Sequence, residues 1–458
     1  MQGIIKDKSF YRSILRLSLP TAFQSLISLL VVMADNIMVA RIDPNGFSLA
    51  AVAQSNSITN FSNALLSGLA GGSIVLISQY WGRQDKARIR EVYAVIAAAC
   101  IAVSLAVIIL IRLFPAFFIS LVINPKETEI TALALEYLPI VCLSFLPFAI
   151  TAAVIGMLKG VEVVRVTIYL TATSLISNVT LNYILIFGKL GFPAMGVRGA
   201  AIATLLARII EASLVCFYFF RVQKVLPVTV RDLTRQRAWA WKDYARYGLP
   251  VGITDAQWAL VGMIKMVIIG QLGKMMINAA AVTDMLMTLG YLFSSALASG
   301  ACVLVGKAVG KKDYLLVRQY ATTIQIMFFL LGLVMTAIVF SLRAPFISLY
   351  ALDEATHALA LTMSGLAAFT LIGTTYHAAC FVGINRGAGD NKFVMMVDMI
   401  CGWLIVLPLT ALAAFVFKFP LYIVYFFTKI DQTFKWLIAF IRLRGDKWIH
   451  NVTREDSP

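Results

Sequence analysis

Long apolar runs separated by short polar segments fill the chain from residue 13 to residue 441. A helix needs about 20 mostly apolar residues to cross a bilayer, and twelve runs reach this length. They lie near residues 13–40, 48–78, 92–113, 132–158, 164–187, 197–220, 248–272, 279–307, 320–341, 358–384, 392–416 and 419–441. We expect the longest helices to tilt or to protrude from the bilayer. The pattern predicts an all-α polytopic membrane protein with twelve transmembrane helices.

The second six runs repeat the first six. The matches are Leu19-Pro20 with Leu249-Pro250, Gly82-Arg-Gln-Asp85 with Gly310-Lys-Lys-Asp313, and Phe118-Ile-Ser-Leu121 with Phe346-Ile-Ser-Leu349. Because each repeat has an even number of spans, both halves enter the membrane from the same side. They are therefore predicted to form two pseudo-symmetric six-helix bundles, as parallel repeats. Transporters built in this way usually bind their substrate near the midplane.

The repeat also predicts the domain boundaries. We expect an N-terminal six-helix lobe at residues 1–220, a cytoplasmic interlobe linker at 221–247, a C-terminal six-helix lobe at 248–441 and a cytoplasmic tail at 442–458. The linker is the longest loop and separates the two halves.

Composition supports the membrane class. Of the 458 residues 60% are hydrophobic and only 14% are charged, whereas a soluble domain has about 25% charged residues. The net charge of +16 does not indicate a nucleic-acid partner, because the basic residues lie in short loops between apolar runs. The six cysteines all fall inside apolar segments without a CxxC spacing, so they are interpreted as small hydrophobic residues.

The distribution of Lys and Arg predicts the orientation. With the N-terminus inside, the cytoplasmic segments hold 27 of these residues and the outer segments hold eight. Such a bias in short loops is the positive-inside pattern. Both termini are therefore predicted to be cytoplasmic. We expect a multi-pass protein of a prokaryotic-type plasma membrane, without a cleavable signal segment.

Asp35 is the polar residue that stands out most in the first run. A carboxylate near the bilayer interior costs about 2.5 to 3.5 kcal/mol even on mild scales, so such residues usually face protein or water and have a function. Asp35 also lies only about 8 Å from the predicted helix end at Arg41, at 1.5 Å per residue. A side chain that extends to the interface is therefore an alternative interpretation.

Asn178 and Asn182 lie four residues apart in the fifth run and hence on one helix face. Together with Asp35 they would form a cluster of one carboxylate and two amide oxygens. Such a cluster suits a small alkali cation, or holds a carboxylate that alternates with a proton. Ordinary hydrogen bonding between helices is the alternative explanation.

The order of motifs along nearly the whole chain resembles the MATE (multidrug and toxic compound extrusion) transporters. The motifs are Leu19-Pro20 followed by Asp35, Gly156-Met-Leu-Lys-Gly160, Asn178-x3-Asn182-Tyr183, Gly196-Val-Arg-Gly-Ala-Ala-Ile-Ala-Thr204, Asn385-Arg-Gly-Ala-Gly-Asp390 and Arg442-Leu-Arg-Gly-Asp-Lys-Trp448. The resemblance implies export of bulky, often cationic amphiphiles in exchange for Na⁺ or H⁺, with no other cofactor.

The same resemblance places Asp35, Asn178 and Asn182 in the cation site of the family, with Thr204 as a less certain fourth member. Some members of the family have an acid at the position of Asn182. The lack of an acid at this position removes one candidate proton carrier and favours Na⁺. The resemblance also marks Asp255, where the family often has an acid, as a coupling candidate.

Further polar residues are candidates for substrate binding or coupling. Asn56, Asn60 and Asn63 form a polar stripe on the second run, which either joins helices or lines a wet cavity. Lys265 and Asp284 both lie about 8–10 Å below the outer ends of their helices, at 1.5 Å per residue, so we expect them to approach each other. That pair could be structural or functional.

Tyr376 and His377 complete the polar set in the tenth run. A single histidine in a membrane helix is as often a hydrogen-bonding residue as a titrating one. The repeat positions of Asp35, Asn178 and Asn182 in the second half are Lys265, Ile405 and Leu409. The oxygen cluster is therefore predicted to occur once, in the first half.

These observations predict a cation-coupled antiporter that exports amphiphilic drugs or toxic metabolites by alternating access. Its expected partners are small amphiphilic substrates and membrane lipids, and we expect a monomer. One alternative is a lipid-linked oligosaccharide or polyisoprenoid flippase of the same superfamily. Another is a non-transporting scaffold or a channel. An enzyme is not expected, because no nucleophile–base pair, metal-ligand spacing or phosphate loop occurs in the sequence.

Overall fold

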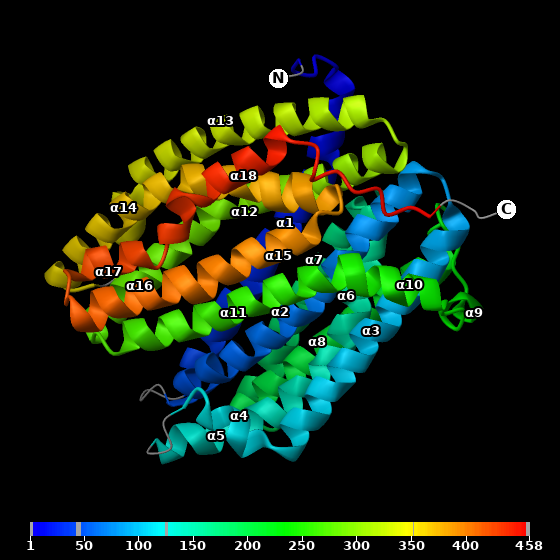
Figure 1. Cartoon of the computed structure of the whole chain (residues 1–458). Helices are drawn as coiled ribbons and strands as arrows, with labels where there is room; N and C mark the ends of the chain where they lie inside the picture. Colours follow the sequence, from blue (N-terminus) through cyan, green and yellow to red (C-terminus); the bar gives the residue numbers. More distant parts are fainter. Residues whose placement is uncertain (1–2, 43–46, 124–126, 351, 455–458) are drawn as a thin grey trace. The chain divides into compact units, whose positions relative to one another are not determined.

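The chain folds entirely into helices in the part that the computed structural model describes, residues 3–42, 47–123, 127–350 and 352–454 (Figure 1). Within these residues, eleven helices are long and apolar enough to cross a membrane. The uninterrupted ones are α1 (Lys8–Ala40), α2 (Phe47–Gly82), α3 (Lys86–Leu113), α7 (Arg165–Phe187), α12 (Lys274–Gly310) and α13 (Tyr314–Ile347). The predicted class, an all-α polytopic membrane protein, is confirmed.

The other five long helices change their winding along their length. They are α5–η1–α6 (Thr128–Gly160), α8–η2 (Gly196–Val222), α10–η3–α11 (Ala238–Gly270), α14–η4 (Glu354–Asn385) and α15–η5–α16–η6 (Asn391–Val416). Within them, α5 is Thr128–Val141, α6 is Phe145–Gly160, α8 is Gly196–Phe217, α11 is Leu249–Gly270, α14 is Glu354–Ala378 and α15 is Asn391–Met399. Two short helices, α4 (Pro115–Ser120) and α9 (Val230–Leu233), lie between spans.

The twelfth predicted span, residues 419–441, consists of two shorter helices around a 3-10 turn. These elements are α17 (Leu421–Phe427), η7 (Ile430–Thr433) and α18 (Lys435–Arg444). At the break, the hydroxyls of Thr428 and Thr433 donate to carbonyl oxygens three residues earlier, at 2.6 Å each. Such local hydrogen bonds compete with a regular helix. The same bonds occur within continuous helices such as α3, so they accompany the break without explaining it alone.

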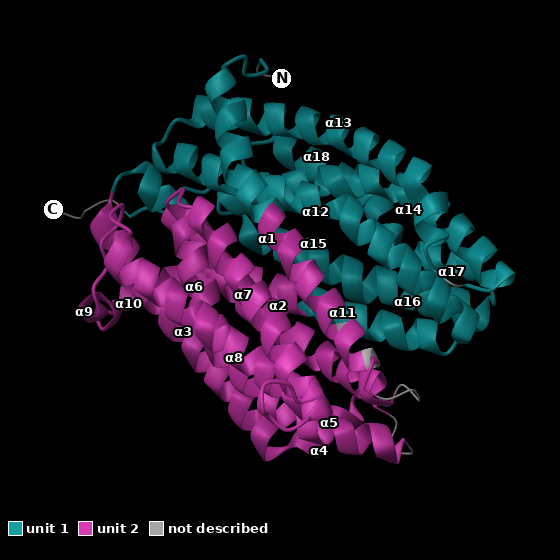
Figure 2. Ribbon diagram, turned by 180° about the vertical axis from the view of Figure 1, so that it is seen from behind, with its two compact units in different colours: residues 1–22, 78–84, 257–458 teal, residues 23–77, 85–256 magenta. Residues whose placement is uncertain are grey.

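Two compact units divide the described chain (Figure 2). Unit 1 contains residues 1–22, 78–84 and 257–458, and unit 2 contains residues 23–77 and 85–256. Helices α1, α2 and α11 each contribute to both units. These units differ from the lobes inferred from the repeat, so the lobe division at residues 221–247 stays a prediction. Residues 455–458 of the predicted tail lie outside the described residues.

The repeat is visible in the backbone at the ends of α2 and α12. Gln84 and Lys312, 228 residues apart, both have left-handed φ angles, of 63° and 61°. In each case the following aspartate caps the next helix, because Asp85 accepts from the Arg88 N–H and Asp313 from the Leu316 N–H, at 3.1 Å each. The two matched sequences therefore form the same turn.

The same helix ends also contact each other in a reciprocal way within unit 1. A side chain on Gly82 would overlap the carbonyl group of Lys307, and a side chain on Gly310 would overlap that of Gln79. Gln79 and Lys307 are themselves 228 residues apart, so each repeat supplies one glycine and one carbonyl. Glycine is required at both positions because the two backbones approach so closely.

The predicted linker contains a short capped helix. Asp232 of α9 accepts hydrogen bonds from the backbone N–H and the hydroxyl of Thr229, at 2.8 Å each. Hydrogen bonds to the charged form stabilise it, and these two bonds lower the pKa of Asp232. Glu91 of α3 holds the linker further, by accepting from the Trp239 indole N–H at 3.1 Å.

Candidate functional site

Asp35 of α1 meets α7 inside unit 2, as predicted, through direct contact with Asn182. The Asn182 amide nitrogen donates to Asp35 Oδ1 at 2.5 Å and lies 3.3 Å from Asn178 Oδ1. Both asparagines are buried, with Asn182 only 1% exposed. The three side chains therefore form one group, called the Asp35 cluster below. The four-residue spacing of the asparagines explains why both amides face the same acid.

The Asp35 cluster has unused acceptor capacity. Asn182 Oδ1 has no hydrogen-bond partner within the described residues. Asp35 forms no ion pair among the residues that the structure describes. Its hydrogen-bond partner is the neutral amide of Asn182. A buried polar atom without a partner is costly. Carboxylate and amide oxygens are the ligands that hard cations prefer, so the cluster has the chemistry of a site for a small cation or a proton.

A continuous buried polar face of α7 extends from this cluster. Its members recur every three or four residues and are at most 7% exposed: Thr167, Thr171, Ser174, Asn178 and Asn182. The hydroxyl of Ser174 donates to Glu211 Oε2 at 3.0 Å, and Arg208 Nη1 donates to the same oxygen at 2.8 Å. Glu211 is thus a second buried acid beside α7.

Two contacts define how α7 and α8 run past each other. Ser174 contacts Glu211, and Gly199 lies directly against the carbonyl of Leu185. The helices are therefore antiparallel, and between these contacts Thr204 lies level with Asn182 and Arg208 level with Asn178. Thr204 donates to the Ala200 carbonyl of its own helix at 3.0 Å. Its predicted position beside the Asp35 cluster is compatible with this register.

The polar stripe of α2 is only partly covered in unit 2. Asn60 is exposed, while Asn56 and Asn63 are half-buried. Asn56 accepts from the Tyr137 hydroxyl of α5 at 3.3 Å. One member of the stripe therefore joins helices, which was the first of the two interpretations.

Asp255 of α11 lies against α2. A side chain on Gly68 would meet the Cβ of Asp255 at 2.9 Å. Asp255 is half-buried. Gly68, which has no side chain, makes room for this acid.

Lys265 and Asp284 were expected to approach each other, but the direct ion-pair partner of Asp284 among the described residues is a different lysine. Asp284 of α12 pairs with Lys429 Nζ at 3.0 Å and accepts from the Tyr425 hydroxyl at 2.8 Å. Lys429 follows the end of α17 and reaches Asp284 because the twelfth run breaks there. Depth along the helix was therefore insufficient to predict the partner.

Tyr376 and His377 of α14 form ordinary hydrogen bonds. The Tyr376 hydroxyl donates to Gln325 Oε1 of α13 at 2.7 Å, and Nδ1 of His377 lies 3.1 Å from the Gly373 carbonyl oxygen of its own helix. Both side chains are half-buried. These contacts match the hydrogen-bonding interpretation of His377.

Sequence reasoning missed a buried charge cluster in unit 1. Lys435 Nζ lies 2.7 Å from Asp398 Oδ1 and 3.0 Å from Asp431 Oδ2, and it stands 4.3 Å from the centre of the Trp258 ring. All three charged residues, called the Lys435 cluster below, are buried. The four-residue spacing of Asp431 and Lys435 was a signal that could have revealed half of it.

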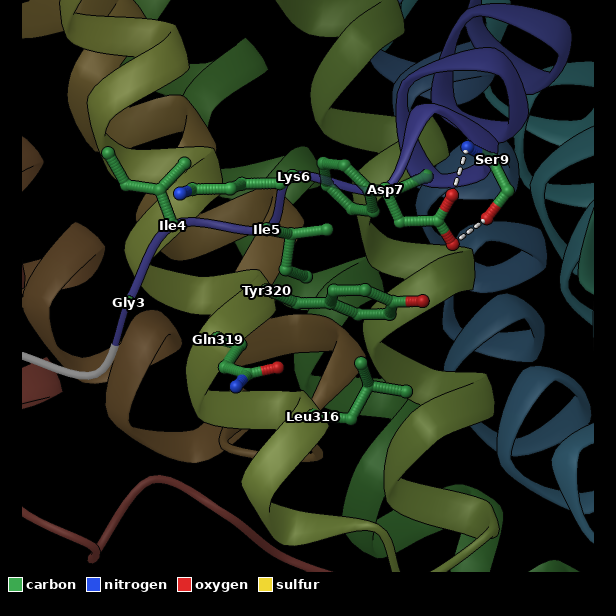
Figure 3. Close-up of a pocket in the computed structure, with 10 residues that line it drawn as sticks. Gly3, Ile4, Ile5, Lys6, Asp7, Ser9, Leu316, Gln319 and Tyr320 are labelled. Atoms are coloured by element: carbon green, nitrogen blue, oxygen red, sulfur yellow. Dashed lines mark hydrogen bonds between the residues drawn. The ribbon is translucent and has the colours of Figure 1, made fainter.

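A shallow pocket near the N-terminus contains none of the predicted site residues (Figure 3). Residues 3–7, Ser9 and Phe10 line it together with Leu316, Gln319 and Tyr320 of α13. Asp7 accepts hydrogen bonds from the backbone N–H and the hydroxyl of Ser9, and these bonds lower the pKa of Asp7. The pocket has no group arranged for transport or catalysis.

Comparison with known proteins places these features in context. The family model MatE matches the chain twice, at residues 20–184 and 250–412. The two matches begin 230 residues apart, the offset between Pro20 and Pro250, and so confirm the repeat. The chain is 27% identical to the "Uncharacterized transporter YisQ" of Bacillus subtilis, over 97% of this chain and 96% of that one.

A second relative carries a more specific name. The chain is 25% identical to the "Probable multidrug resistance protein NorM" of Rhizobium meliloti, over 90% of this chain and 87% of the relative. Among solved structures, the crystal structure of MATE in complex with MaL6 matches with a TM-score of 0.84 and 19% identity, over 94% of this chain and 95% of that one. This match supports the observed fold.

Proposed function

This chain belongs to the MATE family of multi-pass membrane transporters, and we propose that it exports small amphiphilic, often cationic compounds in exchange for Na⁺ or H⁺. The proposed substrate class follows the names of its relatives, several of which are probable multidrug resistance proteins. The coupling ion enters as a transported substrate and is no resident cofactor. The proposal includes a monomer in a prokaryotic-type plasma membrane with both termini in the cytoplasm.

The observation that carries this proposal is the hydrogen bond from Asn182 to Asp35, together with the contact of the same amide with Asn178. A cation that binds Asp35 would displace the Asn182 N–H donor from the carboxylate. The free Asn182 Oδ1 and the Asn178 oxygen would then complete its coordination. A proton would instead neutralise Asp35 directly. Either event removes a negative charge from the region between α1 and α7.

Alternating access then needs a difference in affinity between two conformations. A ligand can shift a conformational equilibrium only as far as its affinities for the two states differ. Cation binding at Asp35 must therefore weaken substrate binding by the same factor by which substrate weakens cation binding. We propose that the polar stripe Asn56, Asn60 and Asn63 lies on the substrate path, with Asp255, Lys265, Asp284, Tyr376 and His377 as further positions that affect coupling.

The deciding experiment measures efflux from vesicles that contain the purified protein. A Na⁺ gradient and a pH gradient are imposed separately on wild type, Asp35→Asn and Asp35→Glu. We expect Asp35→Asn to abolish ion-driven efflux while its melting temperature stays close to that of wild type. Asp35→Glu, which keeps the charge, should retain part of the activity.

Ion-driven efflux at the wild-type rate in Asp35→Asn would contradict the proposal. A wild-type protein that responds to neither gradient would contradict cation coupling and would favour a flippase or a scaffold. The two gradients also identify the coupling ion, because only the gradient of the exchanged ion drives net efflux.

A further inference from the structure

We infer that Arg208 and Glu211 form a counter-ion pair that sets the cation affinity of Asp35, with Glu211 as a positioning residue that keeps the guanidinium of Arg208 from neutralising this acid. The inference rests on the proposed function, since it concerns the same site. It concerns two charged residues of α8 that the motif pattern does not include.

The geometry that supports the inference lies within unit 2. Glu211 Oε2 accepts from both Arg208 Nη1, at 2.8 Å, and Ser174 Oγ, at 3.0 Å. The Glu211 side chain is 3% exposed, so its charge is removed from water. Burial of a carboxylate is favourable only when charged and hydrogen-bonding partners compensate it. Arg208 and Ser174 together provide this compensation.

Arg208 also lies at the level of the Asp35 cluster along α8. It lies level with Asn178 in the α7–α8 register, and its charge acts on Asp35. The guanidinium stacks on the Phe148 ring of α6, 4.9 Å from the ring centre. Arg208 is therefore held on two sides, by the carboxylate of Glu211 and by the Phe148 ring. Thr204, Arg208 and Glu211 share one face of α8, because they are four and three residues apart.

A count of charges shows what this arrangement does. Asp35 and Glu211 are two carboxylates and Arg208 is one guanidinium, so the group carries one net negative charge. One monovalent cation or one proton neutralises it. Without Glu211, the positive charge of Arg208 would already balance the negative charge of Asp35. An entering cation would then have to compete with the guanidinium of Arg208. Glu211 therefore keeps Asp35 available to a mobile cation. It acts through Arg208, because Glu211 itself contacts α7 at Ser174 and Asp35 contacts α7 at Asn182.

The test titrates the coupling ion in vesicles that contain the full chain. Na⁺ is varied at fixed pH, and pH is varied without Na⁺, for wild type, Glu211→Gln, Arg208→Gln and the double variant. Glu136→Gln is the matched control, because it removes the same charge from an exposed position of α5 in the same unit. The measured quantities are the half-saturating cation concentration and the maximal efflux rate.

We expect Glu211→Gln to raise the half-saturating cation concentration about tenfold or more, since it leaves a charge of opposite sign beside Asp35 uncompensated. Arg208→Gln should lower this concentration. The double variant restores one net negative charge and should return to within about threefold of wild type, a difference of about 0.7 kcal/mol or less. A purely structural pair would instead leave the double variant no better than Glu211→Gln.

Two outcomes overturn the inference. One is a half-saturating concentration in Glu211→Gln that equals that of Glu136→Gln. The other is a double variant that shows no recovery. Asp35→Asn in the same vesicles separates this inference from the proposed function. Coupled efflux in Asp35→Asn overturns the proposed function. If Asp35→Asn loses coupled efflux while Glu211→Gln keeps the wild-type cation dependence, only the proposed role of Arg208 and Glu211 is overturned.

Discussion

The two halves of this transporter hold buried acids in opposite ways. In the Asp35 cluster, the carboxylate contacts a neutral amide, and a cation is nearby without forming an ion pair among the described residues. In the Lys435 cluster, both carboxylates contact the same ammonium, at 2.7 and 3.0 Å. Removing one member of a fully paired group leaves a buried charge uncompensated. This difference agrees with the mobile-ion site that we propose in the first half, and it marks a structural connection in the second.

The structural connection joins three separate segments. Asp398 comes from α15, Asp431 from η7 and Lys435 from the start of α18, while Trp258 of α11 covers the ammonium. These contacts hold the broken twelfth run against the rest of unit 1. Asp431 and Lys435 lie where the twelfth run is interrupted. Their ion pairs therefore compensate for the helical hydrogen bonds that are missing there.

The largest effect on stability is expected for Lys435→Met. The substitution keeps the length and the apolar part of the side chain but leaves Asp398 and Asp431 facing each other without a cation. Loss of one partner of a buried ion pair costs about 3–5 kcal/mol. Thermal unfolding in detergent should therefore show a clearly lower melting temperature for Lys435→Met, with Asp35→Asn as the control that stays near wild type.

This pair of variants tests the comparison directly. If Lys435→Met melts like wild type, the Lys435 cluster does not stabilise the fold. If Asp35→Asn is destabilised as strongly as Lys435→Met, Asp35 is a structural residue.

The next effect is expected at Asn182. Asn182→Ala removes the amide that contacts both Asp35 and Asn178. We expect the half-saturating cation concentration to rise about tenfold, equivalent to about 1.4 kcal/mol, with a smaller change in the maximal rate. Asn278→Ala, which removes the same kind of side chain from a half-buried position of α12 away from this site, serves as the control. Equal cation dependence in both variants would remove Asn182 from the site.

The sequence predicted the site of the first half better than that of the second. Asp35 was recognisable because its apolar surroundings make a carboxylate costly, and Asn178 with Asn182 because their spacing places both on one helix face. Both features, the apolar surroundings and the residue spacing, can be recognised within a short stretch of sequence. The pairing of Asp284 with Lys429 depended on the exact place where the twelfth run stops being helical, and hydropathy does not report it.

The fold shows the same division. The number and length of most spans followed from apolar runs, and the repeated turn at Gly82 and Gly310 followed from matched residues. The winding changes within the long helices and the break near Thr428 depend on tertiary packing and on local side-chain hydrogen bonds. Glu211 was missed for a related reason: it is a single acid next to a basic residue, and only the structure shows that α7 buries it.

The smallest effect concerns the hydrogen bond from Tyr425 to Asp284. The Tyr425 hydroxyl is buried and donates to a carboxylate at 2.8 Å, whereas the Tyr376 hydroxyl donates to the neutral Gln325 oxygen at 2.7 Å. Hydrogen bonds to charged groups contribute about 1.5–3 kcal/mol and neutral ones about 0.5–1.5 kcal/mol. Because Lys429 remains beside Asp284 and the acid is partly exposed, we expect the lower end for Tyr425→Phe, about 1.5 kcal/mol.

Tyr376→Phe is the matched control, since it deletes the same hydroxyl from the same unit. Chemical unfolding should show a larger loss of stability for Tyr425→Phe than for Tyr376→Phe. The opposite order would mean that the charge of Asp284 does not strengthen its hydrogen bond. A loss of ion coupling in Tyr425→Phe but not in Tyr376→Phe would support the proposed effect of Asp284 on coupling, and would separate this acid from the Lys435 cluster, whose role is structural.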